Sequence, residues 1–81
     1  MGQELSTEDI VAYEVFTAEA SHTAWLLREA AGKAAAAGDD GRAGTLRAAA
    51  RKVAGDSSGV PVAEAGQRTV ELRRLRDELL G

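Results

Sequence analysis

Residues 7–37 read TEDIVAYEVFTAEASHTAWLLREAAGKAAAA and form the longest segment of this chain with helical character. It contains no proline and is rich in good helix formers, and Ser6 directly before it is a typical helix N-cap. The following GDDG at 38–41 supplies a glycine to end one helix and an aspartate to cap the next. We therefore predict one long helix over residues 7–37 behind a flexible tail over residues 1–5.

The rest of the chain is also predicted to be helical. A second helix is expected over about 42–54, with Gly55 as its terminating residue, and a third over 61–80, because proline is tolerated in a first helical turn. Residues with high strand propensity are few and nowhere alternate over a strand's length. The 81 residues thus predict a single all-α domain, a three-helix hairpin or bundle with a long first helix. Either that helix breaks near Gly32 or it projects beyond its shorter neighbours.

The first helix carries two apolar stripes at helical spacing, on nearly opposite sides. The first has the spacing of a packed core face and comprises Tyr13, Phe16, Ala20, Ala24, Leu27, Ala31 and Ala34. The second, with His22 among its members, comprises Val11, Val15, Ala18, Trp25 and Leu26.

The other two helices offer one modest apolar face each, which suffices for one side of the first helix. These faces are Leu46, Ala49, Ala50 and Val53, and Ala65, Leu72, Leu75 and Leu79. Two interpretations remain. In one, the second stripe is covered by another copy of the chain or by a partner helix, so that homo-oligomerisation completes the core. In the other, the first helix lies between the other two and buries both sides within one chain.

Composition narrows the class of protein. The absence of cysteine excludes disulfides and thiolate metal sites, and the net charge of −3 is unlike that of a dedicated nucleic-acid binder. No basic, apolar leader is visible at the N-terminus and no apolar run approaches a membrane span, so a cytoplasmic protein without membrane contact is expected. The wealth of Ala, Gly and Arg resembles the coding bias of a GC-rich bacterium.

The basic side chains of the second helix support an alternative function. Arg42, Arg47, Arg51 and Lys52 make it the only basic element, and a basic helix can neutralise phosphates. It has no aromatic, Asn or Gln side chain for stacking on bases or reading them. A small nucleic-acid-associated regulator therefore stands as the second hypothesis.

The sequence contains no complete motif for metal binding or catalysis. Glu19 and His22 have the Glu-x-x-His spacing of di-iron bundles, but the chain holds a single histidine, and such a site needs two copies with further carboxylates such as Glu14 or Glu71. Ser21 and His22 are consecutive, so on a helix they point about 100° apart and form no nucleophile–base pair. We expect no metal, no cofactor and no enzymatic activity.

Residues 27–50 contain Ala30-Ala31, Ala34, Gly38-Asp39, Ala43 and Ala50, and this pattern resembles the small residues of a tetratricopeptide-type helical hairpin. The aromatic positions of that family are unfilled and only one repeat exists, so the resemblance implies close packing of an Ala-rich hairpin and no function. The sequence thus predicts a homo-oligomeric interaction or accessory module of a bacterium or phage. Trp25 is its expected anchor, because tryptophan is enriched among the residues that dominate interface energetics.

Overall fold

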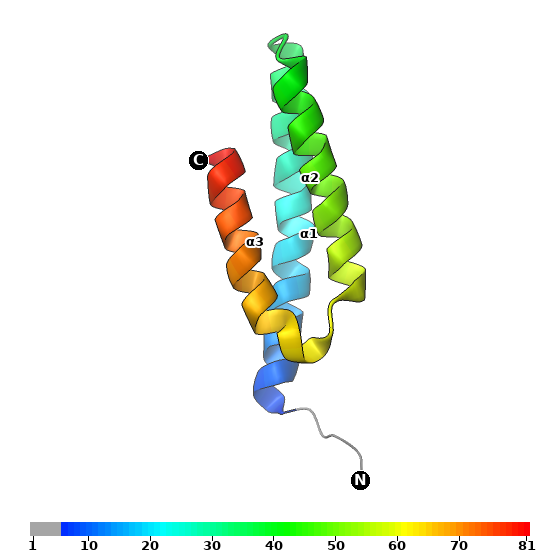
Figure 1. Cartoon of the computed structure of the whole chain (residues 1–81), viewed down its shortest axis with the longest axis vertical. Coiled ribbons are helices and arrows are strands. Elements are labelled where there is room, and N and C mark those ends of the chain that lie inside the picture. Colours follow the sequence, from blue (N-terminus) through cyan, green and yellow to red (C-terminus); the bar gives the residue numbers. More distant parts are fainter. Residues whose placement is uncertain (1–5) are drawn as a thin grey trace.

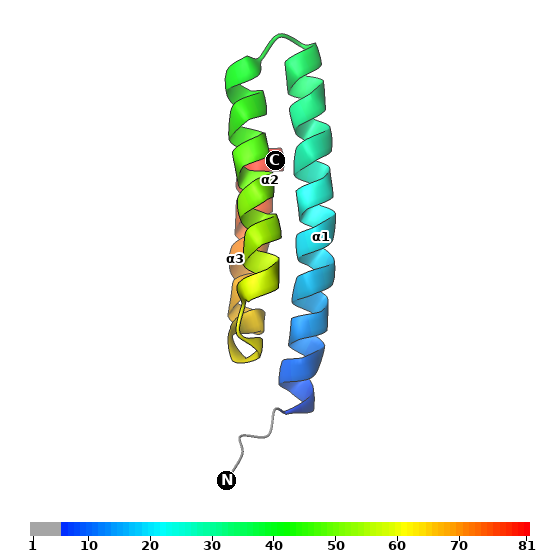
Figure 2. The same cartoon turned by 90° about the vertical axis from the view of Figure 1, so that its right-hand side faces the viewer.

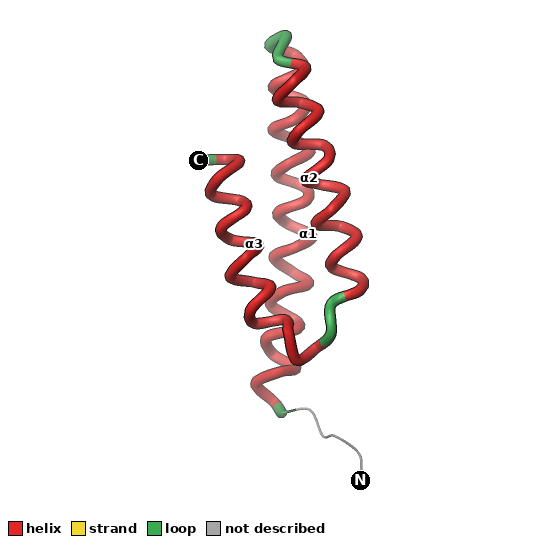
Figure 3. Tube along the Cα trace, in the orientation of Figure 1, coloured by secondary structure: helices red, strands yellow, loops and turns green. Residues whose placement is uncertain are grey.

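A computed structural model describes residues 6–81 and contains three α-helices (Figures 1 and 3). They are α1 (Thr7–Ala36), α2 (Asp40–Gly59) and α3 (Ala65–Leu80), and a single 3₁₀ turn, η1 (Val62–Glu64), leads into α3. No strand occurs among the described residues. The all-α prediction is confirmed, whereas the predicted flexible tail over 1–5 lies outside the described residues.

Helix α1 begins and ends as its flanking residues predict. The Ser6 side chain accepts a hydrogen bond from the Asp9 amide at 3.1 Å, which caps the first turn. At the other end Gly38 has φ +84°, and the amides of Gly38 and Asp39 donate to the carbonyls of Ala35 and Ala34 at 3.0 and 2.8 Å. This is a Schellman ending. The helix runs without a break through Gly32, so the first alternative, a break near that glycine, is wrong.

Helix α2 differs from its predicted range at the C-terminal end. The sequence predicts that it ends at about residue 54 with Gly55 as the terminating residue, but the helix continues to Gly59. The Ser57 hydroxyl donates to the Ala54 carbonyl at 2.9 Å, so the serines are accommodated inside the helix. The helix ends because Val60, with ψ 126°, precedes Pro61, and a residue before proline is pushed out of the helical region.

The third helix also starts differently from the prediction. Pro61 itself is extended, with ψ 139°, and the chain forms η1 before the α-helical hydrogen bonding of α3 begins at Ala65. The C-terminus of α3 is tied to α2, because the Arg42 guanidinium donates to the Leu79 carbonyl at 2.8 Å. That bond satisfies one of the carbonyl groups left free at a helix end.

The three helices form a rod of 57 × 19 × 14 Å with α1 as its common element. Helix α2 runs antiparallel to α1 and α3 runs in the same direction as α1 (Figure 1). Both α2 and α3 pack extensively on α1 but have few direct contacts with each other. Figure 2 shows that α2 and α3 lie on the same side of α1, which leaves its opposite side uncovered.

The core stripe predicted on α1 is confirmed. Phe16, Ala20, Ala24, Leu27, Ala31 and Ala34 are all buried, and Tyr13 is half-buried at its edge. The matching faces of α2 and α3 contribute Ala43, Leu46, Ala50, Val53, Ala65 and Leu72. Small residues dominate this core, so the helices approach closely, as the Ala-rich hairpin pattern implied.

Two threonines are buried in this core with different hydrogen bonding. The Thr69 hydroxyl donates to the Ala65 carbonyl one turn earlier, at 2.9 Å. The Thr23 hydroxyl is equally shielded from solvent and has no partner among the described residues. Burying a hydroxyl without a hydrogen bond costs free energy, so Thr23 is a weak point of the fold.

Candidate interaction surface

The second apolar stripe lies on the side of α1 that neither α2 nor α3 covers. Val11, Val15 and Trp25 are exposed by 51, 40 and 52%, and Ala18 is exposed between them. Leu26 differs from the others, because it is half-buried at the edge of the stripe. The alternative in which α1 lies between its neighbours and buries both sides is therefore wrong.

The exposed residues have the spacing of a helix-pairing seam. The positions Val11, Val15, Ala18, His22, Trp25 and Glu29 follow one another at intervals of four, three, four, three and four. Two helices that repeat apolar positions every 3.5 residues on average keep the same seam in contact over their length. The rings of His22 and Trp25 stack in this seam, with centroids 6.2 Å apart and planes inclined by 14°. They make one broad, flat element at its centre.

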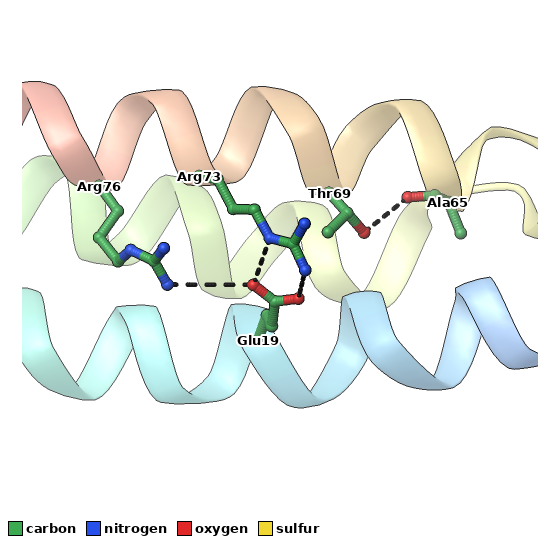
Figure 4. Close-up of polar contacts among 5 residues, drawn as sticks. All are labelled: Glu19, Ala65, Thr69, Arg73 and Arg76. Carbon is green, nitrogen blue, oxygen red and sulfur yellow. Dashed lines mark hydrogen bonds and ion pairs between the residues drawn. The ribbon is translucent and has the colours of Figure 1, made fainter.

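One edge of the seam is tied to α3 through Glu19, as Figure 4 shows. Arg73 donates from Nε and Nη2 to the two carboxylate oxygens of Glu19 at 2.9 and 2.5 Å. Arg76 adds a longer ion pair at 3.9 Å. The hydrogen bonds from Arg73 lower the pKa of Glu19 below its ordinary value, although partial burial opposes that shift.

This pair predicts a pH-dependent contribution to stability. A carboxyl group whose pKa is lowered by folding stabilises the fold above its unfolded pKa, and the contribution is lost as the pH falls through the folded value. We expect Glu19→Gln to lower the free energy of unfolding at about pH 7 and to have a smaller effect at about pH 3. Urea unfolding of wild type and variant at both pH values measures this. Equal losses at the two pH values would contradict the assignment.

The opposite edge of the seam faces α2 and is basic around Arg28. Arg28 of α1 lines a shallow hollow together with Arg47, Ala50 and Arg51 of α2. None of the three arginines forms an ion pair with an acidic group of residues 6–81. Three like charges around one hollow repel one another, so an anionic group bound there would stabilise the arrangement.

The four basic residues predicted as a nucleic-acid contact do not share one face. Arg47 and Arg51 belong to the arginine hollow, but Arg42 is bonded to the Leu79 carbonyl of α3. Lys52 lines a separate hollow between α2 and α3. Prediction from the sequence missed Arg28, because its place beside the α2 arginines depends on how two helices pack.

The hollow between α2 and α3 has a volume of about 310 Å³ and lies where these two helices have few direct contacts. Its floor is apolar, with Phe16, Val53, Leu72 and Leu75. Its rim has equal numbers of basic and acidic side chains: Lys52, Arg68 and Arg74 against Asp56, Glu71 and Glu78. A rim without net charge does not select a charged ligand.

Glu19 and His22, which have the spacing of a metal-ligand pair, have other partners in the structure. Glu19 is engaged by Arg73, and His22 is exposed and stacked on Trp25. Glu71, a candidate further ligand, forms an ion pair with Arg68 at 3.5 Å. Within residues 6–81 no three His, Asp or Glu side chains are grouped as a metal site requires.

Among the described helices, none combines the length and apolar character needed to cross a membrane. Compared with protein-family models, with curated proteins and with solved structures, the chain shows no significant match.

Proposed function

We propose that this protein is a non-catalytic, cytoplasmic interaction module that associates with itself through the exposed seam of α1. The observation that carries the proposal is the exposure of Trp25, Val11 and Val15 on the one side of α1 that no other helix covers. Tryptophan is enriched among the residues that dominate binding energy, and small residues such as Ala18 beside it let a second backbone approach.

Stability gives a second argument for self-association. A chain of 81 residues buries a modest fraction of its surface, and this core is built mainly from alanine. Small domains without disulfides or metals commonly gain the missing stability by oligomerisation. The bare side of α1 is where such a contact adds most apolar burial.

Sedimentation of the wild-type chain over a micromolar concentration series tests the proposal. We expect a concentration-dependent shift from monomer to dimer or larger species. Trp25 is the only tryptophan, so its fluorescence emission is expected to move to shorter wavelength as association removes the indole from water. A single monomeric species with unchanged emission would exclude self-association through this surface.

The second candidate is a nucleic-acid-associated regulator, and the arginine hollow of Arg28, Arg47 and Arg51 is the observation in its favour. Phosphate contacts are strongest at low salt, so a fluorescent duplex at about 50 mM salt is the most sensitive probe. Salt-sensitive binding that Arg47→Ala weakens would favour the regulator. Salt-insensitive self-association without duplex binding favours the interaction module.

A further inference from the structure

We infer that two copies of the chain pair along α1 in antiparallel orientation, with the two Ser21 residues facing each other near the two-fold axis. This inference rests on the proposed self-association and specifies its geometry. It follows from three features of α1: the spacing of the seam, the charges along its two edges, and the arginine hollow beside one of them.

The seam allows several layers of contact in this orientation. In an antiparallel pair, seam residues meet when their numbers add to a constant, here 40, and the residues that flank the seam meet at sums of 42 on one edge and 38 on the other. Val15 then packs against the partner's Trp25, and Ala18 lies opposite the partner's His22. The large aromatic rings of one copy thereby meet small or β-branched residues of the other, which favours close packing.

The two edges of the seam carry different side chains. The edge toward α2 has Glu14, Ser21 and Arg28, spaced by seven residues, and Arg28 lines the hollow with the α2 arginines. The edge toward α3 has Ala12, Glu19, Leu26 and Lys33, and its side is fixed by the bond from Arg73 to Glu19. Charged residues at such flanking positions set the orientation of paired helices.

Charge complementarity selects the antiparallel pair. A two-fold axis across antiparallel helices brings the same edge of each copy together, so Glu14 meets the partner's Arg28, and this contact occurs twice. The two copies of Glu19 also approach, but each has Arg73 as its own counter-ion. A parallel pair would instead join unlike edges, placing Glu14 beside the partner's Glu19 and Arg28 beside the partner's Lys33. Both contacts would set like charges against each other.

The arginine hollow favours the same orientation, because Arg28 belongs to it. Arg28, Arg47 and Arg51 have no acidic partner within the described chain. The antiparallel pair brings the partner's Glu14 to Arg28 and so to this hollow. The second copy supplies the anionic group that the hollow lacks.

Site-specific cross-linking tests the orientation. The chain has no cysteine, so Ser21→Cys and Gly32→Cys each introduce a single thiol, and a side chain at Gly32 would meet nothing within 4 Å. With a short bis-maleimide we expect Ser21→Cys to cross-link and Gly32→Cys to remain uncross-linked. In the antiparallel pair position 32 lies opposite residue 8 of the other copy, so the two thiols are about 36 Å apart, at 1.5 Å per residue. Efficient cross-linking of Gly32→Cys would indicate a parallel pair and overturn the inference, because position 32 then faces its own copy while the two Ser21 residues lie on opposite edges of the seam.

Charge reversal gives a result of opposite sign for the two orientations. Glu14→Arg places a cation against the partner's Arg28 in the antiparallel pair, and we expect self-association to weaken about fivefold. In a parallel pair the same substitution faces Glu19 and would strengthen association. Mixing Glu14→Arg with Arg28→Glu chains is expected to restore wild-type affinity in the heterodimer.

The outcomes separate the orientation from the proposed function. A dimer by sedimentation that fails to cross-link through Ser21→Cys, or that Glu14→Arg strengthens, overturns the antiparallel geometry and leaves self-association standing. A chain that sediments as a monomer at all concentrations overturns both.

Discussion

Replacing Trp25 with alanine is expected to weaken self-association by about 2 kcal/mol or more, which is roughly a thirtyfold rise in Kd. The indole is the largest apolar group on the uncovered side of α1, and in the paired state it would be removed from water against the partner's Val15. Because the side chain is 52% exposed in the single chain, its loss is expected to leave the fold intact. Sedimentation equilibrium measures the Kd, and circular dichroism monitors the helix content.

Val70→Ala is the matched control for this experiment. Val70 is also a large apolar residue and is 56% exposed, but it lies on α3, away from the seam. We expect its replacement to leave the Kd unchanged. A change of well under about 1 kcal/mol for Trp25→Ala, or equal changes for the two variants, would show that Trp25 is an ordinary surface residue.

Thr23→Val is expected to stabilise the fold by about 1–2 kcal/mol. Valine has nearly the shape of threonine, so the substitution keeps the packing and removes a hydroxyl that is fully buried without a hydrogen-bond partner in the described structure. Both residues are β-branched, so helix propensity changes little. Urea unfolding at one fixed protein concentration measures the gain without interference from association.

Thr69→Val provides the comparison that isolates the hydrogen bond. Thr69 is buried like Thr23, but its hydroxyl donates to the Ala65 carbonyl. Removing it exchanges a satisfied polar group for a methyl group, and we expect no gain in the free energy of unfolding or a small loss. Equal stabilisation by both substitutions would mean that apolar volume, and not the unpaired hydroxyl, is responsible.

Most of the fold could be predicted from short-range patterns. The Ser6 cap, the Gly38 ending and the core stripe from Phe16 to Ala34 depend only on neighbouring residues and helical spacing, and the structure confirms them. The end of α2 differs from its prediction, because the helix continues through Gly55 and ends only before Pro61. A glycine inside a helix costs about 1 kcal/mol, whereas proline changes the permitted backbone of the residue before it.

The candidate surface could be predicted only in part. The small apolar area of the shorter helices favoured an exposed second stripe without deciding it, and the edges of that stripe depend on where α2 and α3 lie. Asp77 follows Arg73 at the four-residue spacing of a helical ion pair, yet Arg73 binds Glu19, which is 54 residues away. The position of Arg28 beside the α2 arginines likewise comes from packing and has no local signal.

The sparse contact between α2 and α3 gives the rod unequal local stability. Each of these helices packs mainly on α1, with the bond from Arg42 to the Leu79 carbonyl joining α2 to α3, and α3 is the less supported of the two, because Leu75, Leu79 and Leu80 remain half-buried. Transient opening of α3 therefore does not require the α1–α2 hairpin to unfold. Amide protons of α3 should exchange with solvent through such partial opening. Those in the middle of α1 should exchange more slowly, because their exchange requires global unfolding. Helix α3 would then detach reversibly from an α1–α2 hairpin that stays folded without it.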